Sequence, residues 1–152
     1  MIKPHKGMLQ IAALMFVAMI AILTMGAIFL PVWLKSYLSF LYEHRHFNYL
    51  ALMWILFFAS AQAITMLILA LQIILSVSKE KSFVMGNYHR LRIISYLSFG
   101  IMALFIACMF VYLTPYTVVF IGGTAVLGII VMIISNLLKQ AIEIQEENDY
   151  TV

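Results

Sequence analysis

Few residues of this chain have side chains that could perform chemistry, and their spacing argues against a catalytic centre. The single cysteine, Cys108, cannot form a disulfide within the chain or act in a thiol-exchange pair. His44 and His46 could bind a metal, but no third ligand of suitable type lies near them. His5 and His89 lie outside the long apolar stretches, whereas a bis-histidine haem needs histidines that face one another within helices. We therefore expect no metal, no cofactor and no enzymatic activity.

Charged residues are scarce in this chain, and they gather in a few places. Of the 152 residues, 65% are hydrophobic and 10% are charged, whereas a soluble domain has about a quarter of its residues charged. The charged residues form four clusters, at residues 3–6, 35–45, 79–92 and 139–149. Three long stretches carry no charge, at residues 7–34, 46–78 and 93–138. This pattern excludes a soluble enzyme, a disordered protein and a nucleic-acid binder, and it leaves no charged group inside a membrane for proton or ion transport.

The uncharged stretches predict an all-α integral membrane protein with four helices. A helix needs about 20 apolar residues to cross the hydrocarbon core of a bilayer. The first stretch provides one helix, which we expect Pro31 to end, and the second provides one longer helix. The third stretch is long enough for two helices joined by a tight turn at residues 114–117. A single domain, residues 1–152, is expected to form a four-helix bundle, with helices at about 8–30, 47–78, 88–114 and 117–147.

The distribution of basic residues predicts which side of the membrane each loop faces. Lys and Arg concentrate in the cytoplasmic loops of membrane proteins. Placing both termini in the cytoplasm puts seven of the nine basic residues on that side, with only Lys35 and Arg45 outside. The outer side would then hold Trp33 and Trp54 near the interface, together with a short amphipathic interfacial helix at residues 33–43.

A stripe of polar side chains runs along the second expected helix. Its members, which fall within roughly 80° of arc, are Gln62, Thr65, Gln72 and Ser76. Polar groups that faced lipid would lack hydrogen-bond partners, so this stripe must face other helices or a hydrated cavity. Hydrogen bonds between helices are the favoured interpretation, and a pocket for a neutral lipid or peptide is the alternative.

Small residues mark the expected packing faces of the last two helices. Gly100, Ala103 and Ala107 share one side of the third helix, and Gly122 and Ala125 share one side of the fourth. Small side chains let helix backbones approach closely, which favours helix association in lipid. These faces are expected to hold the bundle together, with contact between two copies of the chain as the lesser alternative.

Opposite charges collect in the two segments that we place on the cytoplasmic side. The basic loop at residues 79–92 carries a net charge of +3, and the acidic tail from residue 139 onward carries −3. Each set lies unfavourably in the dipole of its own helix, so we expect the arginines of the loop to pair with the glutamates of the tail. Asn87 is expected to cap the third helix. The residues of this expected cytoplasmic network are Phe83, Asn87, Arg90, Arg92, Glu143, Glu146, Glu147 and Asp149.

Three sequence elements, together with the four-helix layout, resemble a known family. They are Lys81-Ser82-Phe83, Arg90-Leu91-Arg92 after Asn87, and the ending Glu146-Glu147-Asn148-Asp149-Tyr150-Thr151-Val152. The whole chain resembles domain-of-unknown-function family 2975, although Ser82 stands where this family usually carries proline. The resemblance implies a small multi-pass protein of the bacterial cytoplasmic membrane without catalytic activity. Members are often encoded beside a small helix-turn-helix regulator, so the resemblance also implies a DNA-binding partner.

Two functions are compatible with these features. The first is a non-enzymatic regulatory or scaffold protein whose cytoplasmic loop and C-terminal tail bind a soluble partner, such as a small helix-turn-helix transcription regulator. The alternative is a membrane ligand-binding or immunity protein, which would use the polar stripe and the outer amphipathic helix to protect against membrane-active peptides. The basic loop could equally serve as an orientation signal that contacts anionic lipid. A transporter or membrane enzyme ranks last.

Overall fold

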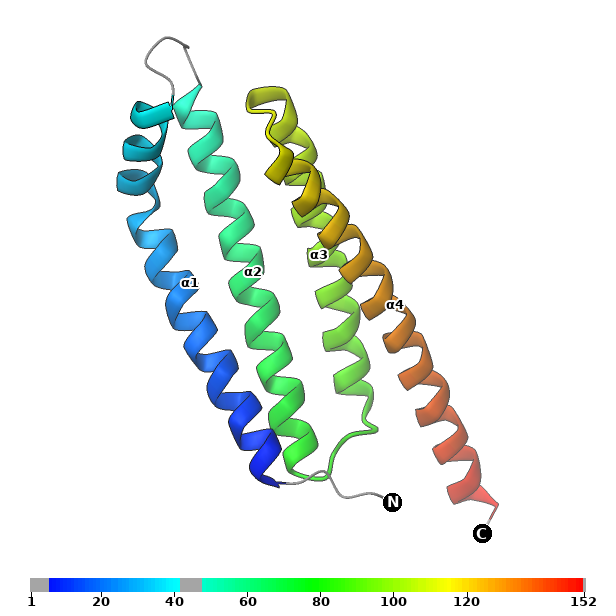
Figure 1. Ribbon diagram of the computed structural model, residues 1–152. Helices are drawn as coiled ribbons and strands as arrows, with labels where there is room; N and C mark the ends of the chain where they lie inside the picture. The colour runs from blue at the N-terminus through cyan, green and yellow to red at the C-terminus, as the bar shows by residue number, and fades with distance from the viewer. Residues whose placement is uncertain (1–5, 42–47, 152) are drawn as a thin grey trace.

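Four long helices make up the described part of the chain. The computed structural model describes residues 6–41 and 48–151. Within them the backbone forms α1 (Lys6–Leu41), α2 (Tyr49–Ser78), α3 (Met85–Val111) and α4 (Pro115–Tyr150), without a β-strand (Figure 1). Each helix is long and apolar enough to cross a membrane. The predicted all-α class and the number of membrane-spanning helices are therefore confirmed.

The helices alternate in direction, so the two ends of the molecule differ in content. The first residues of α1, the α2–α3 loop and the last residues of α4 lie at one end, which we call the terminal end (Figure 1). The start of α2 and the α3–α4 turn lie at the other, which we call the turn end. Under the orientation predicted from the basic residues, the terminal end faces the cytoplasm.

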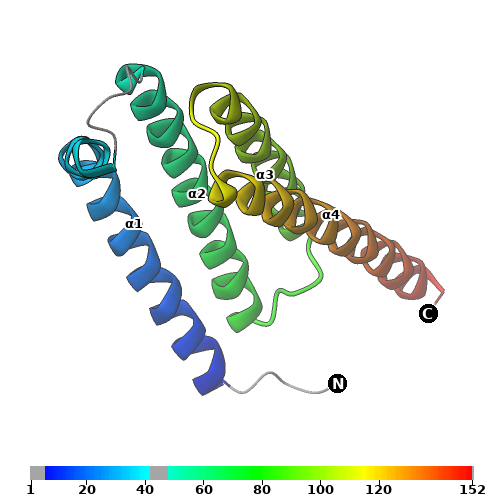
Figure 2. The ribbon, with the colours of Figure 1, turned by 45° about the horizontal axis from the view of Figure 1, so that its top comes forward.

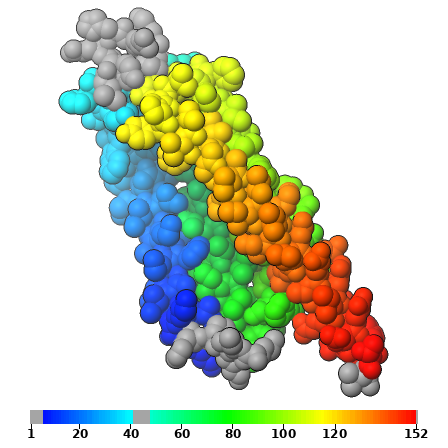
Figure 3. All heavy atoms as spheres, turned by 45° about the vertical axis from the view of Figure 1, so that its right-hand side comes forward, coloured from blue at the N-terminus to red at the C-terminus, as the bar shows by residue number. Residues whose placement is uncertain are grey.

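The four helices stand in a row in chain order. α1 packs on α2, α2 on α3 and α3 on α4, whereas no described Cα atom of α1 lies within 8 Å of one in α4. Figure 2 shows α4 crossing α3 obliquely, and α1 on the side of α2 that faces away from α3. The space-filling view shows α2 as a recessed floor between α1 and α4 (Figure 3). The expected bundle is thus open along one side.

Pro31 does not end the first helix, contrary to our prediction. It lies inside α1, which continues to Leu41. Proline removes one backbone hydrogen bond and crowds the preceding turn, which kinks a helix without necessarily ending it. Figure 2 shows the last part of α1 nearly end-on while its earlier part runs across the view. The expected interfacial helix at residues 33–43 is therefore, within the described residues, the kinked last part of α1.

A hydrogen bond from α2 supports the kink in α1. The Tyr49 hydroxyl donates to the Pro31 carbonyl oxygen at 3.0 Å. Tyr49 is the first residue of α2, so this bond ties the start of α2 to the kink although the two residues are 18 positions apart. The turn between α3 and α4 lies at residues 112–114, slightly before the predicted 114–117, because Pro115 begins α4 instead of lying in the turn. The Thr117 backbone N–H donates to the Thr114 hydroxyl oxygen at 3.4 Å.

The tightest packing lies between α3 and α4. Ser95 and Ser98 are fully buried, and their hydroxyls donate to the backbone carbonyls of Gly128 at 2.8 Å and Thr124 at 2.7 Å. A Cβ atom on Gly128 would lie 3.0 Å from the ring of Phe99. Small and hydroxyl-bearing residues thus bring the two backbones close and satisfy polar groups within the apolar layer.

The small-residue faces predicted from the sequence are only partly used. Gly100 packs against Gln62 of α2, as a packing face requires. Gly122, in contrast, has open space where a Cβ would lie, and Ala103 and Ala107 are exposed. The close α3–α4 contact is made instead at Gly128, one helical turn beyond the predicted face of α4.

Candidate functional site

A network of polar side chains at the terminal end joins α2 to α3. The Arg90 Nε donates to Gln72 Oε1 at 3.1 Å, and the Arg90 Nη1 donates to Asn87 Oδ1 at 2.9 Å. Gln72 belongs to the polar stripe predicted on the second helix, so one member of that stripe forms the expected bond between helices. Two neutral amide oxygens therefore hold the Arg90 guanidinium in a fixed direction without neutralising its charge.

Asn87 holds the α2–α3 loop in place and does not cap α3. The helix begins at Met85, and its N-cap position is Val84, without a side-chain capping bond. The Asn87 side chain is 1% exposed, and its Nδ2 donates to the carbonyl oxygens of Lys81 and Ser82, both at 3.1 Å. The prediction of an N-cap is wrong because the helix starts at Met85, three residues earlier than an Asn87 cap requires, and the amide turns inward to the loop.

The end of α2 adds further bonds to this loop. The Ser76 hydroxyl donates to the Lys81 carbonyl oxygen at 2.9 Å, and the Lys81 backbone N–H donates to the Ser76 carbonyl oxygen at 3.1 Å. Glu80 adopts the left-handed conformation, with φ of 62°, which lets the chain reverse in few residues. These bonds give the loop between α2 and α3 a defined backbone conformation.

Arg92 forms a second anchored cation, on the side of α3 that meets α4. Its Nε donates to the Tyr96 hydroxyl at 3.1 Å, and its Nη1 donates to Asn136 Oδ1 at 3.0 Å. The guanidinium also lies 5.4 Å from the centre of the Tyr96 ring, within cation–π range. As with Arg90, the anchoring groups are neutral.

The predicted ion pairs between the arginines and the acidic tail do not form. Within the described residues, neither Arg90 nor Arg92 pairs with any of the predicted partners, Glu143, Glu146 and Glu147. Glu143 instead forms an ion pair within its own helix, with its Oε1 3.7 Å from the Nζ of Lys139. The reason is axial position: the acidic residues occupy the last turns of α4, beyond the level at which α3 begins (Figure 1). The acidic side chains, including Asp149, are exposed.

Two other members of the α2 stripe, Thr65 and Gln62, make no hydrogen bond to another helix among the described residues. The Thr65 hydroxyl donates to the Ala61 carbonyl of its own helix at 2.9 Å. Gln62 packs against Gly100 of α3, and its buried Oε1 has no hydrogen-bond partner within the described chain. Hydrogen bonding between helices, the favoured interpretation, therefore holds for Gln72, while Gln62 makes a packing contact.

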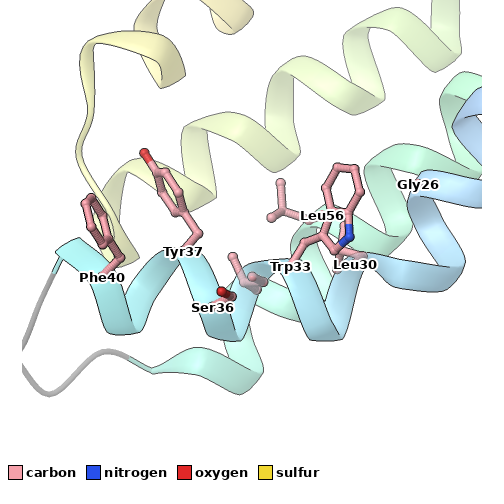
Figure 4. A pocket seen from close by; sticks show the side chains of 8 residues that line it. Gly26, Leu30, Trp33, Ser36, Tyr37, Phe40 and Leu56 are labelled. Carbon is pink, nitrogen blue, oxygen red and sulfur yellow. The ribbon is translucent and has the colours of Figure 1, made fainter.

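An apolar groove lies on the kinked part of α1 at the turn end. Its volume is about 630 Å³. Figure 4 shows the side chains of Trp33, Tyr37 and Phe40 pointing to the same side of α1, with Leu56 of α2 at the back. The lining residues are Gly26, Leu30, Trp33, Leu34, Ser36, Tyr37, Phe40 and Leu56. Apart from Ser36 and the polar tips of Trp33 and Tyr37, these side chains could hold only an apolar molecule.

A smaller cavity of about 260 Å³ adjoins this groove and is lined by all four helices. It shares Leu34, Tyr37 and Leu56 with the groove. Phe105 of α3 and Phe120 of α4, which also line it, stack with their ring centres 5.0 Å apart. The row of helices is therefore bridged at the turn end by side chains around an apolar space.

Sequence reasoning missed several residues that the structure brings into these sites. Tyr96 and Asn136 anchor Arg92, and neither was predicted to do so. Asn136 carried a usable signal, because it is an amide within the long uncharged stretch at residues 93–138. The predicted metal alternative at His44 and His46 lies outside the described residues, as do Glu43 and Arg45.

Comparison with known proteins gives one match. The model of the family described as "Protein of unknown function (DUF2975)" matches residues 4–152. No curated protein and no solved structure matches the chain. Because the matched region spans nearly the whole sequence, it includes all four helices, the basic loop and the acidic tail. The chain therefore belongs to the DUF2975 family.

Proposed function

We propose that this protein is a non-enzymatic regulatory or scaffold protein of the bacterial cytoplasmic membrane, whose terminal end binds a soluble partner. The observation that carries the proposal is the exposed acidic end of α4, which the arginines of α3 do not neutralise. Charges that are not matched within a protein are available to match those of another.

The length of α4 supports a projecting role for its last turns. α4 has 36 residues, or about 54 Å of helix, whereas the hydrocarbon core is about 30 Å thick. Its uncharged part ends before Lys139, so the remaining residues to Tyr150 extend past the membrane as a helix. A docking helix that is already folded avoids the entropy cost of ordering on binding.

The chemistry of this segment favours a basic partner. Glu146, Glu147 and Asp149 are exposed, and Ile144 and Tyr150 expose apolar surface beside them. An acidic helix with an aromatic and an aliphatic anchor complements a positively charged protein surface. DNA-binding proteins carry such basic surfaces, so a small helix-turn-helix regulator is the partner to test first.

Co-purification of such a regulator in mild detergent tests the proposal. We expect the wild-type protein to retain the regulator and the variant E146Q/E147Q/D149N to lose it, because the substitutions remove charge without changing side-chain size. The matched control is K79Q/K81Q, which alters charge at the same end of the molecule but on the loop. Equal retention by the wild type and the triple variant would refute docking on α4.

A second candidate function is supported by the groove on α1. A groove of about 630 Å³ that carries three aromatic side chains could bind an apolar molecule or a membrane-active peptide. This is the ligand-binding or immunity alternative, which was expected to use the α2 stripe and the outer amphipathic helix; the groove on the kinked part of α1 supports the second of these.

Peptide sensitivity of a deletion strain tests this second function. Wild type is expected to restore resistance and F40A is expected to fail. F110A is the control, because Phe40 and Phe110 are similarly exposed, at 88% and 90%, and Phe110 does not line the groove. Restoration by F40A equal to that of wild type would exclude the groove from this role.

A further inference from the structure

A cation, Arg92, lies between α3 and α4, and no carboxylate of the described residues forms an ion pair with it. Arg92 is held by the Tyr96 hydroxyl at 3.1 Å and by Asn136 Oδ1 at 3.0 Å. These bonds use Nε and one N–H of Nη1, so the N–H groups of Nη2 make no hydrogen bond to any described residue. The direction of the guanidinium is thus fixed, and its Nη2 N–H groups remain available to donate hydrogen bonds to a ligand.

The position of Arg92 matches the level of lipid headgroups. The residue is the last charge before the uncharged stretch at residues 93–138, and its two anchors, Tyr96 and Asn136, lie inside that stretch. Tyrosine is enriched at this depth, where an apolar ring can carry a polar tip. Basic pockets between membrane helices on the cytoplasmic side bind anionic headgroups.

An apolar stripe runs from this cation toward the membrane centre. On α4, the residues one, two and three turns before Asn136 are Ile133, Ile129 and Val126, and all three are exposed. Their spacing of three and four residues places them on the same side of the helix as Asn136. A ligand with an anionic head and a long apolar chain would match both the cation and the stripe.

We propose that Arg92, positioned by Tyr96 and Asn136, binds the phosphodiester of a phospholipid in the leaflet at the terminal end, with an acyl chain along the apolar stripe of α4. The open edge of the guanidinium suits a phosphate, which arginine can bind through two parallel hydrogen bonds. Lipids with a net negative charge are favoured, because they have no cationic headgroup to compete with Arg92. This proposal does not depend on the proposed soluble partner, whose docking segment lies further along α4.

Lipid binding to the purified full-length protein tests this proposal. Phosphatidylglycerol is titrated in mild detergent, and bound lipid is counted by native mass spectrometry. We expect R92Q to bind at least about tenfold more weakly than wild type. R92K keeps the charge but loses the fork, so its affinity should fall between the two. K139Q is the control, because Lys139 is the helical neighbour of Asn136 and pairs with Glu143.

The source of the phosphate is tested with two soluble probes, glycerophosphoglycerol and inorganic phosphate. Both carry a phosphate group but no acyl chains, so we expect them to bind far more weakly than phosphatidylglycerol. Equal affinity for the soluble headgroup and the lipid would overturn the role of the stripe. The proposed site at Arg92 would be contradicted if wild type and R92Q bound the lipid with equal affinity. It would also be contradicted if R92Q and K139Q lost lipid affinity to the same extent. If R92Q does not fold, R92K with wild-type lipid affinity would be an equally decisive contradiction.

Discussion

At the scale of single residues, the polar network is built from amides where charges were expected. Gln72, Asn87 and Asn136 each accept a hydrogen bond from an arginine of α3. An amide oxygen fixes the direction of a guanidinium as a carboxylate does, but it leaves the net charge in place. The terminal end therefore keeps the positive charge of its loop and the negative charge of α4 as two separate surfaces.

Replacing Asn87 by alanine should destabilise the protein. The substitution removes two bonds to the loop carbonyls and the acceptor for Arg90 from a buried position. Loss of a buried hydrogen-bonding group costs about 1–3 kcal/mol, so we expect a loss of that size in the free energy of unfolding. Denaturation in detergent measures it, with N148A on the exposed end of α4 as the control. An N87A variant as stable as N148A would show that the loop does not depend on this amide.

The sequence was informative about which residues matter at this scale, and less so about their partners. Gln72, Asn87, Arg90 and Arg92 were all singled out from their type and position. Their partners depend on the axial offset and rotation of neighbouring helices, which a single sequence does not specify. Hence the arginines were expected to meet glutamates, but the acidic turns of α4 extend past the start of α3 (Figure 1).

At the scale of helices, local sequence signals are overridden by packing. Pro31 was expected to end the first helix, but α1 continues with a kink and is tied to α2 by the Tyr49 hydroxyl. A turn before α4 was predicted, but with the helix starting at residue 117; Thr114 and Pro115 were assigned to the turn, whereas they cap and begin α4. The α3–α4 contact was misplaced because several small residues on α4 could have served, and only Gly128 meets a ring.

The contact at Gly128 predicts opposite outcomes for two glycines of α4. G128V should destabilise the protein by about 1–3 kcal/mol, because its side chain would overlap the Phe99 ring and separate α3 from α4. G122V should have little effect, since a Cβ at Gly122 meets nothing within 4 Å. Thermal unfolding in detergent compares the two. A larger loss for G122V than for G128V would mean that the other face of α4 is the packed one.

At the scale of the whole molecule, the row of helices separates two surfaces of different chemistry. The turn end carries an apolar groove formed on α1, and the terminal end carries the polar loop and the acidic end of α4. Seven of the nine basic residues fall on the terminal side under the predicted orientation. The two proposed functions therefore face opposite sides of the membrane.

This orientation can be tested with single cysteines in a C108S background. Tyr116 at the turn end and Tyr150 at the terminal end are both strongly exposed. We expect Y116C to react with a membrane-impermeant maleimide in intact cells, and Y150C to react only after permeabilisation, because basic residues favour the cytoplasmic side. The reverse labelling pattern would place the acidic end of α4 outside the cell.

The most direct test of the central claim is photo-crosslinking in living cells from the end of α4. A photoreactive amino acid in place of Ile144 reports what touches the acidic helix, and the same residue in place of Ile129 reports contacts inside the membrane. Docking on α4 predicts a crosslink from position 144 to a soluble basic protein, lost when E146Q/E147Q/D149N is introduced, and none to it from position 129. Crosslinks from position 144 to lipid alone, or crosslinks unchanged by the triple substitution, would contradict the proposal.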